Sequence, residues 1–239
     1  MNTRKDFLLA SSLLTLAPAL ADAATPTPSP SPSPKAGAKR PPLTFTFDRA
    51  RFDEILAKPV KHKQCFGATK LVPDVLNGMN NSIDAYENYL KEGVGAMQAV
   101  AVLYHGFSIA LAFNDALWNE YLIPLLGSKQ FQKYASAEER DAVAKIALGK
   151  GNPFLHSASS DPDDVSVERL VSKGSSFFVC HNAIAGASGF IADSSKQPVE
   201  KVHAAIMNGI VPGALAVPAG VMAVNACQEA KFTYIQSSL

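Results

Sequence analysis

The sequence predicts an α/β fold: a three-layer α/β/α sandwich with a mostly parallel sheet of about five strands. Two observations carry this prediction. Continuous apolar runs, such as those in 96–106 and 175–182, are typical of strands that are covered on both faces. Segments with helical spacing separate these runs, which indicates βαβ units with right-handed crossovers.

Composition limits the choice of function. The chain has 239 residues, of which 47% are hydrophobic and 18% are charged, and its net charge is +1. This is enough for one well-buried domain of about 170–200 residues plus extensions. Basic residues are scattered among acidic ones, so the sequence offers no basic stripe for nucleic acid or for an anionic membrane surface.

Residues 1–23 have the pattern of a signal peptide. A basic start (Arg4, Lys5) precedes an apolar span over 7–20, and small residues around Ala21 and Ala23 fit a cleavage site. The span is too short for a permanent membrane helix. The start also resembles a twin-arginine signal, with Lys5 where the second Arg would stand, so both export routes stay open. We expect a periplasmic protein.

A Pro/Ser-rich linker is predicted over 24–43, because the repeat TPTPSPSPSP has no side chains to bury and favours extended conformations. A docking peptide for a proline-reading domain is the alternative. The α/β domain then occupies 44–239. It includes a polar, turn-rich insertion over 127–164, in which Ser136 and Glu139 fit a capping box.

The elements of the domain follow in order. The predicted strands are 62–70, 96–106, 175–182, 213–220 and 232–236. The predicted helices are one that starts near Asp48, then 72–92 with Gly93 as its cap, 107–126, 136–148, 165–172, 183–192, 198–208 and 221–230.

Chemistry-bearing residues gather where the predicted strands end. In an open parallel sheet, ligands bind beyond the carboxyl ends of the strands. The residues expected at this edge are Cys65, His105, Cys180, His181, Asn182, Pro218 and Gly220. The topology therefore predicts a pocket there, formed by segments that are distant in the sequence.

Cys180 is the candidate nucleophile. It precedes a predicted helix for which Asn182 is the expected N-cap, and a helix N-terminus together with a nearby imidazolium favours the thiolate. His105 and His181 are the candidate imidazoles. The alternative for Cys180 is that it packs as a small apolar residue at the end of a buried strand. The alternative for His105 is that its side chain forms a hydrogen bond with the backbone of the loop. His181 points to the opposite face if the strand continues through it.

Other site classes lack their patterns in the sequence. It contains no CxxC or HxxxH pair for a metal, and no glycine-rich loop for a nucleotide, so we expect neither a metal nor a cofactor. The loop with Asp161, Asp163 and Asp164 lacks the calcium-loop pattern. The cysteines number three, so at least one thiol stays unpaired within the chain, and packing is expected for Cys227.

Over about residues 60–236 the chain resembles the DsrE/DsrF-like (YchN/TusD-like) family. The resemblance rests on the order of elements and on three motifs: His105-Gly106, the strand end FFVCHN (177–182), and the closing segment VPAGVMAVNACQEAKFTYIQ (217–236). It implies a five-stranded parallel sheet and assembly as a trimer or hexamer. In the sulfur-relay members a cysteine after the third strand carries a persulfide, and Cys180 stands at that position.

Two departures from the family pattern bear on function. The relay members act in the cytoplasm, whereas this chain carries an export pattern. The Arg that often follows the cysteine in exported relatives is absent from Asn182-Ala183-Ile184-Ala185.

Three hypotheses follow, in this order. The first is a periplasmic sulfur or thiol carrier that uses Cys180, with a sulfur donor or acceptor as its partner; any activity would be sulfurtransferase-like. The second is a non-enzymatic oligomeric protein that binds a small ligand in the same pocket. The third is a disulfide between Cys65 and Cys180, which fails if another strand lies between theirs.

Overall fold

The computed structural model describes residues 43–146, 149–157 and 165–237. The predicted signal peptide, all but the last residue of the predicted linker, and the loop with Asp161, Asp163 and Asp164 lie outside these residues. Every described residue lies in the compact unit Pro42–Leu239.

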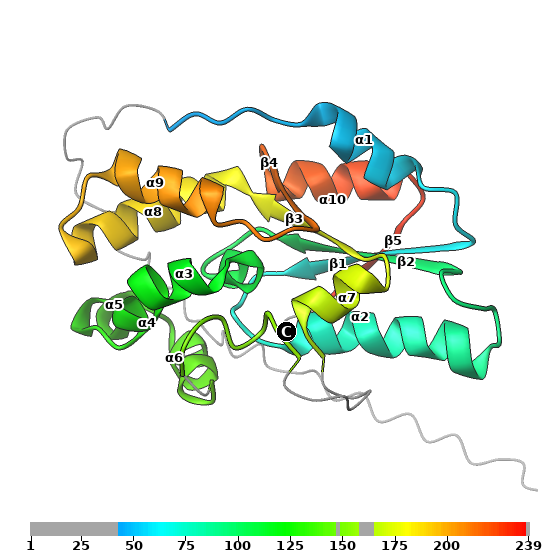
Figure 1. Cartoon of the computed structure of the whole chain (residues 1–239), viewed down its shortest axis with the longest axis horizontal. Helices are drawn as coiled ribbons and strands as arrows, with labels where there is room; N and C mark the ends of the chain where they lie inside the picture. The colour runs from blue at the N-terminus through cyan, green and yellow to red at the C-terminus, as the bar shows by residue number, and fades with distance from the viewer. Residues whose placement is uncertain (1–42, 147–148, 158–164, 238–239) are drawn as a thin grey trace, which may run out of the picture. The chain divides into compact units, whose positions relative to one another are not determined.

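A five-stranded, all-parallel sheet forms the centre of this unit, and the predicted fold class is confirmed (Figure 1). The strands are β1 (His62–Ala68), β2 (Met97–Leu103), β3 (Ser176–Cys180), β4 (Ala214–Val217) and β5 (Thr233–Gln236), in the spatial order β4-β3-β2-β1-β5. Each of the five predicted strands is present, and no strand end is shortened by more than three residues.

Helices cover both faces of the sheet. The helices are α1 (Arg49–Ala57), α2 (Asp74–Asp84), α3 (Asp115–Leu117), α4 (Ile123–Leu126), α5 (Lys129–Tyr134), α6 (Ala137–Ala144), α7 (Val167–Ser172), α8 (His181–Ser195), α9 (Val199–Asn208) and α10 (Gly220–Glu229). In Figure 1, α1 and α10 lie on one side of the sheet and α2 and α7 on the other.

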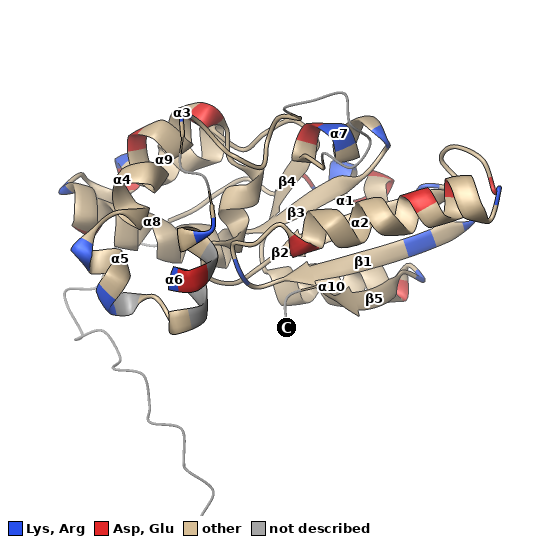
Figure 2. Cartoon of the chain, turned by 90° about the horizontal axis from the view of Figure 1, so that it is seen from below, with Lys and Arg blue, Asp and Glu red and all other residues tan. Residues whose placement is uncertain are grey.

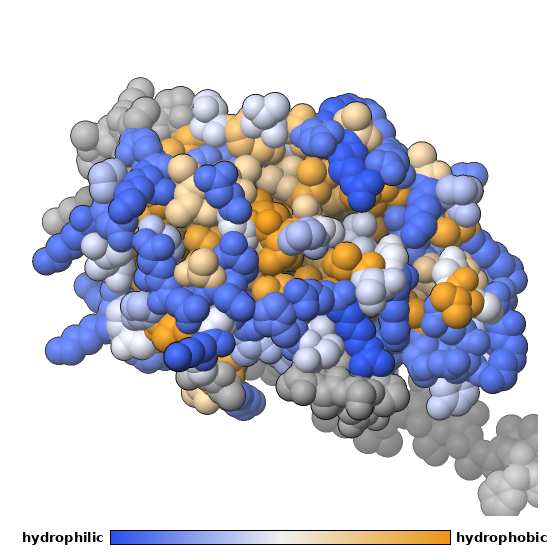
Figure 3. Space-filling view, viewed as in Figure 1, coloured by the Kyte–Doolittle hydropathy of each residue, from blue (hydrophilic) through white to orange (hydrophobic). Residues whose placement is uncertain are grey.

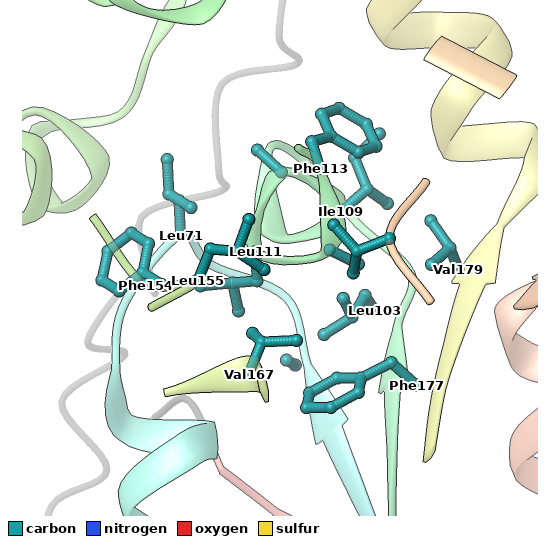
Figure 4. Packing of buried hydrophobic residues seen from close by; sticks show 14 of the residues in the cluster. Leu71, Leu103, Ile109, Leu111, Phe113, Phe154, Leu155, Val167, Phe177 and Val179 are labelled. Atoms are coloured by element: carbon teal, nitrogen blue, oxygen red, sulfur yellow. The ribbon is translucent and has the colours of Figure 1, made fainter. Parts of the chain in front are cut away.

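Two apolar clusters fill the spaces between these layers. The larger cluster joins β2 and β3 to α2, α7, α8 and α9, and Figure 4 shows part of it, with Phe177 and Val179 of β3 pointing into it. The smaller cluster contains Phe178 of β3 together with residues of α1 and α10. Neighbouring side chains of β3 thus enter opposite cores, which explains why its sequence is a continuous apolar run.

The order of the strands creates a switch point between β3 and β4. From β1 to β4 the chain moves across the sheet in one direction, and then β5 returns to the far side of β1. The helix that follows β3, α8, packs in the larger cluster, whereas α10, which follows β4, packs in the smaller one. The two connections therefore leave toward opposite faces, which is the arrangement that opens a crevice at the carboxyl ends of strands.

Two predicted helices differ from the structure. The helix expected over 72–92 changes into a π-helical turn (Ala85–Tyr89) and ends at Leu90, so Gly93 is not its cap. The segment 107–126 is not one helix: it begins with a 3₁₀-helix (Ser108–Ala112), and Asn114 then caps a new helix by accepting from the backbone N–H of Leu117. Asn favours this capping position over a helix interior.

Side-chain hydrogen bonds connect the predicted insertion to the rest of the domain. The buried amide of Asn152 donates to the backbone carbonyl of Phe113 over 2.7 Å. The ring of His156 lies between Asp115, at 2.9 Å, and Glu168, at 2.8 Å. These carboxylates favour the imidazolium and raise the pKa of His156.

Charges of both signs are interspersed along the helices in Figure 2, as the sequence predicts. In the view of Figure 3, apolar residues reach the surface near the centre of the face and hydrophilic residues surround them. Within the described residues, no helix has the length and apolarity that crossing a membrane requires.

Candidate functional site

Cys180 lies at the junction of β3 and α8. It is the last residue of the strand and also the N-cap of the 15-residue helix, so the predicted cap, Asn182, is wrong: Asn182 lies in the first turn. The helix begins earlier than predicted because the backbone turns directly at the strand end. Cys180 pairs in register with Val217 of β4, and this places it beside the switch point.

A pocket of about 390 Å³ lies in front of Cys180, and we call it the thiol pocket. It is lined by Tyr104, His105, Gly106, Phe107, Cys180, Asn182, Ala183, Gly186, Ala187 and Phe190. The structure therefore brings together Cys180, His105 and Asn182 from the residues that the sequence singled out. Cys180 itself is 4% exposed, so a reactant must enter the pocket to reach it.

The first turn of α8 supplies the positive end of a helix dipole at this place. No Lys or Arg lies among the described residues that line the pocket. The helix N-terminus is thus the main source of positive potential for an anion that forms on Cys180.

The loop after β2 forms the opposite wall. Gly106 has a φ of 51°, a left-handed conformation that glycine adopts without strain, and His105 beside it is exposed. The hydroxyl of Tyr104 lies 3.3 Å from that of Tyr234 on β5. Phe107 packs edge-on against Phe190 of α8, with ring centroids 5.8 Å apart, and so connects the two walls.

Pro218 and Gly220 do not line the thiol pocket, although the sequence placed them there. Gly220 supports it indirectly: a Cβ at this position would lie 1.9 Å from the Cβ of Tyr104. The absence of a side chain at Gly220 therefore allows α10 to approach the wall residue Tyr104 closely.

His181 points away from the thiol pocket. Its ring stacks on Phe45 with centroids 4.1 Å apart, and its Nε2 lies 2.9 Å from Nε2 of His203 on α9. Burial lowers the pKa of His181, and the nearby His203 lowers it further; burial also lowers the pKa of His203. Two neutral imidazoles can form this hydrogen bond, because Nε2 of one ring then donates and Nε2 of the other accepts.

Cys65 lies in the middle of β1 rather than at its end, and it is fully buried in the smaller cluster, so it does not belong to the pocket. A hydrogen bond with the buried thiol of Cys227 and desolvation raise the pKa of Cys65. Strand β2 separates β1 from β3, which excludes a bridge between Cys65 and Cys180 in this fold. Cys227 lies in the core, as expected.

The described residues contain no group of three or more His, Cys, Asp or Glu side chains that could hold a metal ion. Tyr104 lies at the end of the second strand, as the sequence predicts. Sequence reasoning missed the other aromatic walls of the pocket, Phe107 and Phe190. The signal that could have found Phe107 is its position directly after the His105-Gly106 turn at the end of a buried strand.

Comparisons with protein-family models, with curated proteins and with solved structures each return no match.

Proposed function

We propose that this chain is an exported, periplasmic DsrE-like protein that carries sulfane sulfur as a persulfide on Cys180. The observation that carries the proposal is the thiol pocket, in which this thiol lies at the N-terminus of α8, beyond the carboxyl ends of β2 and β3. The resemblance of its strand-end motif to that of the sulfur-relay members supplies the chemistry. Assembly as a trimer or hexamer is part of the same proposal.

The reaction is a sulfur transfer without net oxidation. The thiolate of Cys180 attacks the outer sulfur of a donor persulfide or polysulfide, a new S–S bond forms, and the donor leaves as a thiolate or a polysulfide one sulfur shorter. An acceptor thiolate then attacks the outer sulfur and regenerates Cys180. The dipole of α8 stabilises the anion on Cys180, while the small pocket excludes bulky nucleophiles.

Inorganic polysulfide tests this function. We expect the reduced protein to gain about 32 Da on the peptide that contains Cys180, and to lose that mass when a thiol acceptor is added. The variant C180S should gain nothing, whereas C227A, which removes a core thiol, should still form the adduct. A Cys180 peptide that stays unmodified, or an adduct found equally on Cys227, contradicts the proposal.

The apolar wall favours a second candidate. Phe107, Ala183, Ala187 and Phe190 provide most of a surface that fits an apolar ligand without any reaction at sulfur. In that case C180S retains thermal stabilisation by an apolar fluorescent probe such as anilinonaphthalene sulfonate, and F190A loses it. The polysulfide adduct separates the two candidates.

A further inference from the structure

A second pocket lies at the opposite edge of the sheet, and we call it the amide pocket. Its volume is about 530 Å³, and its walls come from the segment at and after the end of α1 and from the amino ends of β2, β3 and β4. It is lined by Arg51, Glu54, Ile55, Ala57, Lys58, Pro59, Gln98, Val171, Gly174, Ser175, Ser176 and Gly213. None of these residues belongs to the thiol pocket.

Two buried polar side chains of the amide pocket have unused hydrogen-bonding atoms. Gln98, which is 1% exposed, donates from Nε2 to the carbonyl of Ile55 over 2.9 Å, and this fixes the direction of its amide. Its Oε1 has no partner among the described residues, and neither has Oγ of Ser175, a residue that is 4% exposed. Native proteins seldom leave such atoms unpaired, so these two atoms indicate a bound group.

Lys58 adds a positive charge to the same pocket. Its ammonium donates to the carbonyl of Gly174 over a long 3.4 Å, and within the described part of the chain it forms no ion pair with a carboxylate. The other cation, Arg51, is already paired with Glu54 at 2.6 Å. The pocket therefore holds one uncompensated positive charge.

Glycine at position 174 makes room for this charge. Gly174 has a φ of 88°, and a Cβ at this position would lie 3.0 Å from Nζ of Lys58. A side chain there would crowd the ammonium and close this part of the pocket.

We infer that the amide pocket binds a small monocarboxylate that carries a hydroxyl beside its carboxylate. One uncompensated cation matches a single negative charge, and the hydroxyl of Ser175 can donate a second hydrogen bond to the carboxylate. Oε1 of Gln98 can only accept, so the ligand must supply a donor, which an adjacent hydroxyl provides. The pocket volume of about 530 Å³ leaves room for such a ligand. This inference does not depend on the function proposed for Cys180.

Calorimetric titration with D-glycerate tests the inference, because glycerate has both the charge and the donors. We expect a Kd below about 1 mM. Propionate, which lacks the donors, and glycerol, which lacks the charge, should each bind at least about ten-fold more weakly, as loss of a charged or buried hydrogen bond predicts.

Variants assign the binding to the pocket. We expect K58M and Q98M each to weaken glycerate binding at least about ten-fold. K201M removes a lysine from the exposed surface of α9 and should bind as the unmodified protein does, which controls for net charge. K58M changes a partly exposed side chain, so its result stands even if Q98M fails to fold. The inference is overturned if glycerate does not bind at about 10 mM, if K58M binds it as tightly as K201M does, or if a crystal grown with glycerate shows only water on Gln98 and Ser175.

Discussion

The thiol pocket and the amide pocket lie at opposite edges of one sheet, and they are built in different ways. The thiol pocket has walls that are largely apolar and aromatic around one reactive atom, and its positive potential comes from a helix N-terminus. The amide pocket has a cationic side chain and two buried polar atoms that find no partner within the described part of the chain.

The two pockets depend to different degrees on the topology of the backbone and on particular side chains. The thiol pocket lies beyond the carboxyl ends of β2 and β3, between the loop after β2 and the start of α8, at the edge of a parallel sheet where ligands usually bind. No such rule favours the amino edge of a parallel sheet. The amide pocket depends on particular side chains from α1, β2 and the turn before β3, and single substitutions should remove it without changing the fold.

The largest effect that we expect separates Cys180 from the two core thiols. In the folded protein, iodoacetamide should modify Cys180 at least roughly 100-fold faster than Cys65 or Cys227, because those two react only when the core opens. Mass spectrometry of peptides taken over time measures the three rates. In urea the three rates should converge, which serves as the control. The thiol pocket confers no reactivity if the three cysteines are alkylated at equal rates in the folded protein. The same conclusion follows if Cys180 is alkylated more slowly than a free model thiol below about pH 8.

The second prediction concerns the wall of the thiol pocket. In G220A the new methyl group would collide with Tyr104, including its backbone Cα at 3.1 Å, so we expect the free energy of unfolding to fall by about 1–3 kcal/mol. G186A is the matched control. Gly186 lies inside α8 with no atom within 4 Å of an added Cβ, and Ala there should gain up to about 1 kcal/mol through helix propensity.

Urea unfolding measures both variants. If G220A is as stable as G186A, position 220 tolerates a methyl group, and the close approach of α10 to Tyr104 does not depend on glycine there. A destabilised G220A that still forms the polysulfide adduct at an unchanged rate would show that the position of Tyr104 is not needed at the thiol pocket.

The sequence predicts the sheet well because the physical cause of its pattern is local. A strand such as β2 has cores on both faces, and Ala101 and Val102 enter different clusters, so nearly every position must be apolar. The place of Cys180 follows from the same logic, since a strand end is visible where the apolar run stops.

Side-chain direction at the strand ends could not be predicted in this way. His181 is the first residue of α8, one position after the strand, so the helix rather than the strand sets its direction. Cys65 was expected near the end of its strand, but three residues of β1 follow it, up to Ala68. Gln98 is a single polar residue in an apolar run, and only the structure shows that its Oε1 lacks a partner.

The last prediction concerns the buried pair behind the thiol pocket. The pKa values of His181 and His203 are lowered in the folded protein, so below the unfolded value of about 6.5 the unfolded chain binds more protons. Stability should therefore fall as the pH drops from about 7.5 to about 5, by at most about 1.4 kcal/mol per pH unit for each imidazole. H203Q removes one of these groups, so its free energy of unfolding should depend less steeply on pH.

His156 provides a control of opposite sign. Its pKa is raised by Asp115 and Glu168, so its contribution is fully present below about 6.5 and is lost as the pH rises through the folded value. Because this side chain is half exposed, the contribution should stay below about 1 kcal/mol. H156Q should therefore steepen the loss of stability only in the part of the range above about pH 6.5. Urea unfolding across this pH range measures all three proteins. An unchanged slope in H203Q would mean that the pair is not neutral in the fold. A neutral pair places no imidazolium behind Cys180 at neutral pH, which leaves the N-terminus of α8 and the side chain of His105 in the thiol pocket as the groups that can activate the thiol.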